Sequence, residues 1–178
     1  MNYIIFDLEA TCWENENGRK SEIIEIGAVK LNYKLEKIAL FSKFVKPVIN
    51  PELSDFCTKL TTIKQSDVEN ADIFEKVIKE FEDFIGEDGY LCSWGFYDKK
   101  QILAECTLKD YSGKIVNLLE KHISVKHQFA KIREIRPCGM SYALELLGLK
   151  LEGTHHRGID DALNITKIFK EVFEELRF

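Results

Sequence analysis

Two acidic side chains lie close together in the first apolar segment of the sequence. Asp7 and Glu9 fall at the end of an Ile- and Phe-rich run, residues 1–8, that is too short for the core of a helix. The run predicts a buried strand, on which Asp7 and Glu9 share one face, roughly 7 Å apart. Buried carboxylates either take up a proton or bind a cation, so the pair predicts a site for Mg²⁺ or Mn²⁺. The alternative is a strand that ends at Leu8 and leaves both acids in solvent.

A third carboxylate that faces inward is predicted near the start of the last helix. Asp161 lies four residues before Ile165 and seven before Ile168, and both isoleucines belong to an apolar stripe. Asp161 therefore falls on the face that packs against the protein. Asp160 falls on the polar face, where it favours the helix dipole. We expect Asp161 to serve a functional site and Asp160 to stabilise the first helical turn.

Two further residues could complete such a site. His156 lies in a polar loop five residues before Asp161, and a histidine beside a carboxylate–metal cluster can act as a general base. We expect the adjacent His155 to point elsewhere. Asp98 follows a predicted strand, 90–94, at the end where ligand sites gather in α/β sheets. The alternatives are an ordinary surface residue for His156 and a helix N-cap for Asp98.

The elements that must position these residues follow from hydrophobic periodicity. Strands at 22–31 and 38–45 would form an antiparallel meander with the first strand. Further strands are predicted at 90–94 and 122–126, helices at 53–60, 74–85, 99–107 and 140–147, a capping box at 66–69, and a final helix whose apolar stripe runs from 165 to 176. Strands followed by helix–strand alternation predict an α/β sandwich with a mixed sheet.

Length and composition limit the class of protein. A chain of 178 residues predicts one domain, 1–178, and no apolar run reaches the roughly 20 residues that a membrane helix needs. The N-terminus lacks the basic region of a signal peptide, and we expect a cytoplasmic protein. Five widely spaced cysteines without a C-x-x-C pair argue against zinc and against a disulfide framework. A net charge of −5 gives no general basic surface for long duplexes.

Three motifs, taken in order, resemble those of a known enzyme family. They are Phe-Asp-Leu-Glu-Ala-Thr-Cys (6–12), Ser-Trp-Gly-Phe-Tyr-Asp (93–98) and His-His-Arg-Gly-Ile-Asp-Asp-Ala-Leu-Asn-Ile (155–165). Their order and the H-x4-D spacing are similar to the DEDDh 3′–5′ exonucleases, and most closely to the Eri-like RNA exonuclease branch. Segments 22–27 and 56–63 also look like that branch, so the resemblance covers essentially the whole chain. Thr62 departs from it, because the branch often has glycine there.

The resemblance implies an RNase H-like three-layer α/β sandwich, a mixed five-stranded sheet with helices on both faces. It also implies hydrolysis assisted by two divalent ions, Mg²⁺ or Mn²⁺. Carried over by motif, Asp7, Glu9 and Asp161 would bind one ion. Asp98 would bind the second ion, and Asp7 would bridge the two ions. His156 would deprotonate the attacking water. Paired ions stabilise both oxygens of a phosphoryl displacement, and their charge would let an acidic protein bind nucleic acid.

The implied substrate is a single-stranded nucleic-acid 3′ end, with RNA favoured over DNA and nucleoside 5′-monophosphates as products. Aromatic side chains at motif positions would stack on bases. The candidate substrate contacts are Ala10, Thr11, Phe56, Leu60, Thr61, Ile63, Trp94, Tyr97 and His156. Core packing is an equal alternative for Trp94 and Phe56. A locally basic stretch, 121–136, could contact the phosphates of the nucleic acid, or it could form a helix face that is exposed to solvent.

Two other functions stay open. The KapD-like sporulation inhibitors share this domain, so the chain could be a regulatory or binding protein with weak or no turnover. Catalysis is favoured because all five acidic and histidine positions are chemically intact. An RNase H-type endonuclease would need four carboxylates without the histidine loop. Neither the dinucleotide-binding fingerprint nor the P-loop fingerprint occurs in the sequence.

Overall fold

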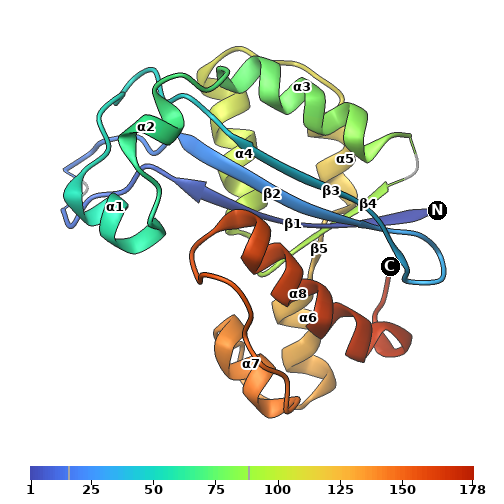
Figure 1. The fold of residues 1–178 in the computed structure, drawn as a ribbon. Helices are drawn as coiled ribbons and strands as arrows, with labels where there is room; N and C mark the ends of the chain where they lie inside the picture. Colours follow the sequence, from blue (N-terminus) through green and yellow to red (C-terminus); the bar gives the residue numbers. More distant parts are fainter. Residues whose placement is uncertain (16, 88) are drawn as a thin grey trace.

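The computed structural model describes residues 1–15, 17–87 and 89–178. Within these residues, five strands form one mixed sheet in the order β3-β2-β1-β4-β5 (Figure 1). The strands are β1 (Asn2–Ala10), β2 (Ile23–Leu31), β3 (Lys37–Phe44), β4 (Gly89–Ser93) and β5 (Ile123–Ser124). β2 pairs antiparallel with both β1 and β3, whereas β4 pairs parallel with both β1 and β5. β1 therefore lies at the centre of the sheet.

Helices cover both faces of the sheet, as Figure 1 shows. One face carries α3 (Phe74–Ile85), α4 (Tyr97–Leu108) and α5 (Ile115–Leu118), and the other carries α6 (Val125–Ile132), α7 (Met140–Leu146) and α8 (Gly158–Val172). The short helices α1 (Asp55–Thr61) and α2 (Gln65–Val68) lie beyond the carboxyl end of β1, and 3₁₀ turns follow α5 (Leu119–Lys121) and α8 (Phe173–Glu175). This arrangement confirms the predicted three-layer sandwich. No helix in the described ranges has the length and apolar character needed to cross a membrane.

The alternating side chains of β1 separate two apolar cores. Ile4, Phe6 and Leu8 pack with α3, α4 and α5, whereas Tyr3 and Ile5 pack with α6, α7 and α8. Because the strand continues through Ala10, the alternative in which it ends at Leu8 is wrong. Asp7 and Glu9 lie on the face of β1 that α8 covers.

Helix α8 begins in close backbone contact with β2. A Cβ atom at Gly27 would overlap backbone atoms of Gly158 and Ile159. The backbone N–H of Gly158 also donates to the Glu25 carboxylate at 3.0 Å. The absence of a side chain at Gly27 thus lets the first turn of α8, with Asp161, approach the centre of the sheet.

Several predicted boundaries are wrong, among them those of the last strand and of helix α4. The last strand, predicted at 122–126, is limited to Ile123–Ser124. Val125 and Phe129, one helical turn apart, are both buried in the core, so the segment continues as α6. Helix α4, predicted to start at residue 99, starts at Tyr97. Asp98 is therefore in its first turn rather than at the N-cap.

The ends of α1 and α2 also differ from the sequence pattern. Residue 66, the predicted start of a capping box, lies inside α2. The Asp67 carboxylate instead accepts the backbone N–H of Lys64 at 2.8 Å and stabilises the helix start. Thr62 forms the C-cap of α1 in the left-handed conformation, with φ of 62°. That conformation suits glycine, the residue that the resemblance to the Eri-like branch leads us to expect at this position.

We expect Gly27→Ala to destabilise the protein by about 3 kcal/mol or more, because an overlap with backbone atoms cannot be relieved by moving a side chain. Denaturant titration of the free energy of unfolding measures the change. Gly139→Ala is the matched control, since a Cβ there meets no atom within 4 Å. Its expected change is below about 1 kcal/mol. Equal losses in the two variants would contradict a special role for the β2–α8 approach.

Candidate active site

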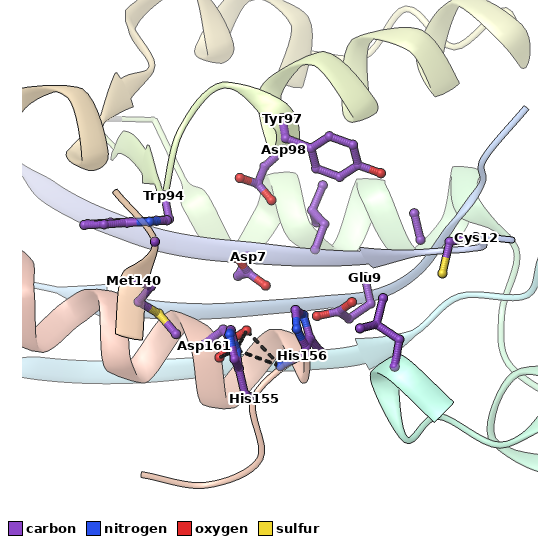
Figure 2. A pocket seen from close by; sticks show the side chains of 14 residues that line it. Asp7, Glu9, Cys12, Trp94, Tyr97, Asp98, Met140, His155, His156 and Asp161 are labelled. Carbon is purple, nitrogen blue, oxygen red and sulfur yellow. Dashed lines mark hydrogen bonds and ion pairs between the residues drawn. The ribbon is translucent and has the colours of Figure 1, made fainter. Parts of the chain in front are cut away.

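A pocket of about 400 Å³ opens at the carboxyl ends of β1 and β4. Five predicted catalytic residues line it, namely Asp7, Glu9, Asp98, His156 and Asp161. Figure 2 shows Asp7 and Glu9 on β1 between the other groups, with Asp98 on one side and Asp161 on the other. Residues from three distant parts of the chain therefore meet in one place. Their roles in catalysis stay predictions.

Three carboxylates form a close group in this pocket. Ligand oxygens of Asp7, Glu9 and Asp161 all lie within 4.8 Å of one another. Glu9 is 8% exposed and Asp161 is 5% exposed. Burial, followed by repulsion from the neighbouring acids, raises the pKa of Glu9 from 4.5 to about 8 and raises the pKa of Asp7 well above its ordinary value. Such a group binds either protons or a cation, and its all-oxygen ligands suit a hard divalent ion.

Asp98 lies across the pocket, in the first turn of α4. Burial raises its pKa to about 6, although hydrogen bonds from the Ser93 side chain and from the backbone of Asp98 and Leu8 oppose that shift. Ser93 Oγ in turn lies 2.9 Å from Nε2 of His122. The buried Ser93 thus orients Asp98. This support joins residues on β4, α4 and the turn before β5, and it has no local pattern from which it could be predicted.

The neighbours Asp160 and Asp161 point in different directions, as the helical periodicity predicts. Asp161 faces the pocket, whereas the Asp160 carboxylate accepts the backbone N–H of Thr154 at 2.8 Å. Asp160 therefore orders the loop that leads into α8. Only Asp161 is placed to bind a cation together with Asp7 and Glu9.

Both histidines of the 153–158 loop face the pocket, so the expectation that His155 points elsewhere is wrong. His155 Nδ1 lies 3.1 Å and 3.0 Å from the two carboxylate oxygens of Asp161. The backbone of His156 is left-handed, with φ of 64°, and its N–H donates to Asp161 Oδ2 at 3.0 Å. The sharp turn brings the two rings into a stack, with centroids 4.0 Å apart. Burial and the neighbouring His155 lower the pKa of His156, which favours the neutral ring that can accept a proton.

An ion pair behind the pocket holds the histidine loop, and neither partner is among the predicted site residues. The Glu25 carboxylate, 1% exposed, accepts hydrogen bonds from Arg157 Nε at 3.1 Å and Arg157 Nη2 at 3.2 Å. It also accepts the N–H of Gly158, and the Arg157 guanidinium lies over the Phe44 ring. Glu25 thereby fixes the start of α8 next to His156. Arg157 also balances a fourth carboxylate that would otherwise add to the repulsion in the pocket.

The predicted substrate contacts divide into two sets. Ala10, Leu60, Trp94 and Tyr97 line the pocket together with His156. Trp94 also packs on Phe129 and donates from Nε1 to the Cys138 carbonyl, so it serves the core as well. The side chains of Thr11, Thr61 and Ile63 are buried, and Phe56 is exposed on α1 outside the pocket lining. Met140, at the start of α7, lines the pocket and was not predicted.

A family model described as an exonuclease, RNase T, matches residues 4–169. The chain belongs to this exonuclease family. The Drosophila melanogaster 3′-5′ exonuclease Snipper is 33% identical over 92% of this chain and 66% of its own length. Human 3′-5′ exoribonuclease 1 is 33% identical over 96% of this chain and 52% of its own length. The chain thus spans about half to two thirds of these curated relatives.

A solved structure of the same family has a similar fold. It is the nuclease domain of 3′hExo, described as a DEDDh family member bound to rAMP. It is 32% identical, has a TM-score of 0.90, and the match covers 99% of this chain and 94% of that chain. The resemblance to the DEDDh 3′–5′ exonucleases and the RNase H-like fold are therefore confirmed.

The raised pKa values predict how stability depends on pH. The folded protein holds protons on Glu9 up to about pH 8 and on Asp98 up to about pH 6. At a pH above the ordinary pKa values of these two groups, the folded protein therefore binds more protons than the unfolded chain does. We therefore expect the melting temperature of chelator-treated protein to fall as the pH rises from about 6.5 to 8, above the range in which the lowered pKa values of His122 and His156 oppose the trend. Mg²⁺ or Mn²⁺ should restore it at the upper end, since a cation replaces the protons.

Thermal unfolding with and without the metal ions measures this effect. Glu9→Gln is the informative variant, because the amide cannot ionise and the fall should become shallower. A melting temperature that is independent of pH in the wild-type protein, and equally so in Glu9→Gln, would contradict the repulsion.

Proposed function

We propose that this chain is a metal-dependent 3′–5′ exonuclease that releases nucleoside 5′-monophosphates from single-stranded ends, with RNA as the favoured substrate. The observation that carries the proposal is the close group of Asp7, Glu9 and Asp161 in a pocket that also holds Asp98 and His156. The relatives support it, since several are named 3′-5′ exoribonucleases. A similar solved structure has rAMP bound, and another is described as recognising the 3′ end of a histone mRNA stem-loop.

The donor set fits two divalent cations, Mg²⁺ or Mn²⁺. Asp7, Glu9 and Asp161 would hold one of them, and Asp98 would hold the second together with Asp7. Bound ions of this kind stabilise the attacking and leaving oxygens of an in-line displacement and make water a better nucleophile. The raised pKa values of Asp7 and Glu9 support this assignment, because a cation relieves the repulsion that raises them.

The chain's own residues would supply proton transfer and substrate positioning. A ring nitrogen of His156 would accept the proton of the attacking water, and the lowered pKa keeps that nitrogen unprotonated near neutral pH. Trp94, Tyr97 and Leu60 line the pocket and would hold the terminal base against flat or apolar surfaces. The pocket volume suits a single nucleotide, which favours removal of one unit at a time.

The intact site favours turnover over a regulatory role of the sporulation-inhibitor type. A protein that only bound a partner would have no need to keep three repelling carboxylates in a pocket beside a neutral histidine. A cytoplasmic location and a single domain stay predictions.

A time course on 5′-labelled single-stranded RNA and DNA of one sequence tests the proposed function. With Mg²⁺ or Mn²⁺ we expect a ladder that shortens from the 3′ end, faster on RNA, and no cleavage in excess EDTA. A circular single strand of the same sequence is the control and should stay intact. Full-length RNA under every metal tested, or cleavage of the circle, would contradict the proposal.

His156→Ala should lower the rate of hydrolysis by about 10²–10⁴, the usual contribution of a general base. Because the assigned metal ligands are carboxylates, the affinity for Mn²⁺ should change little. Initial rates and Mn²⁺ titration, measured on the same preparation, separate the two effects. Loss of Mn²⁺ binding in this variant would show that His156 is a ligand rather than a base.

A further inference from the structure

Two histidines and one carboxylate converge on one wall of the pocket, beside the all-carboxylate group (Figure 2). One ligand atom from each of His155, His156 and Asp161 lies within 4.8 Å of the others. His155 Nδ1 is 3.0 Å from Asp161 Oδ2. A ring nitrogen and a carboxylate oxygen attract each other at this distance only when a proton or a cation lies between them. These three side chains therefore present ligand atoms close enough together to share one cation.

The chemistry of this group differs from that of the carboxylate group. Asp7, Glu9 and Asp161 offer only oxygen, which suits Mg²⁺ and Mn²⁺, whereas two imidazoles and one carboxylate suit Zn²⁺. Zinc binds nitrogen at about 2.0–2.1 Å, so the stacked rings must turn toward a common point. The His155 side chain is 42% exposed in a surface loop, which leaves room for that rotation.

The neighbouring charges favour such a site. Asp7 and Glu9 lie on the adjacent strand, and a cation that approaches Asp161 favours their ionised, negatively charged forms. Arg157 is the nearest cation in the loop, but its guanidinium is engaged by Glu25 and by the Phe44 ring. A zinc ion at His155 would therefore be attracted by these carboxylates as they ionise, and its fourth position would be open to water.

We propose that His155, His156 and Asp161 form a Zn²⁺ site that inhibits the enzyme. The inhibitory effect rests on the proposed exonuclease function, whereas the site itself does not. A zinc ion bound there would withdraw Asp161 from the carboxylate group. It would also occupy a nitrogen of His156, which could then no longer accept a proton from water. One zinc ion would thus prevent His156 from deprotonating water and would also remove Asp161 as a ligand for the Mg²⁺ or Mn²⁺ ions.

Calorimetric titration of the whole chain with Zn²⁺, in the presence of excess Mg²⁺, tests the site. We expect one zinc ion to bind the wild-type protein despite the Mg²⁺. His155→Gln should weaken this binding at least about tenfold, since even outer-sphere partners of a metal contribute that much. His127→Gln is the matched control, because His127 is exposed on α6 and contacts Ser124 and Phe96 instead. Its zinc affinity should equal that of the wild type.

Two results of the titration would overturn the site. One is the absence of zinc binding to the wild-type protein. The other is equal zinc affinity in the wild type and His155→Gln, which would place the ion in the carboxylate group. Circular dichroism of each variant confirms that it is folded before it is titrated.

Inhibition is measured as the initial rate with Mg²⁺ at rising Zn²⁺, relative to the zinc-free rate of the same variant. The zinc concentration for half-inhibition should rise at least about tenfold in His155→Gln, in parallel with the weaker binding, and stay unchanged in His127→Gln. Equal inhibition of all three proteins would overturn the proposed inhibitory role. If no variant hydrolyses RNA with Mg²⁺, the proposed function fails, and the titration alone still decides whether the zinc site exists.

Discussion

Repulsion between buried carboxylates is the constraint on which this structure depends. Asp7 and Glu9 share one face of the central strand, and α8 brings Asp161 against them. The protein places these groups where water screens them poorly, so the pKa of Glu9 rises to about 8. Three carboxylates that share one position form an all-oxygen donor set, which suits a divalent cation that would supply the missing positive charge.

The surrounding framework keeps the carboxylates together against this repulsion. Gly27 allows α8 to start directly on β2, and the Glu25 carboxylate binds the Gly158 N–H and the Arg157 guanidinium at the same point. These contacts join β2 to the histidine loop through residues far apart in the sequence. The close backbone approach and the ion pair therefore set both the position of Asp161 and the turn that presents the histidines. The same turn creates a second set of ligands, of different chemistry, from one shared carboxylate.

Much of the fold and part of the site could be predicted from periodicity. A period of two placed Asp7 and Glu9 on one face of β1, and a period of 3.6 separated Asp161 from Asp160. The direction of His155 could not be predicted, because a non-glycine residue such as His156 gives no sequence signal for a left-handed backbone. Glu25 was missed because its partner lies 132 residues away, and a buried ion pair has no local pattern.

Direct binding of Mn²⁺ to the wild-type protein, Asp160→Asn and Asp161→Asn tests the central claim most directly. The two variants remove one negative charge each from adjacent residues of α8, so they differ only in which way the lost carboxylate points. If the carboxylate group is a cation site, the wild type and Asp160→Asn should bind Mn²⁺ with similar affinity, and Asp161→Asn should bind it much more weakly. Equal affinities in all three proteins would contradict the claim.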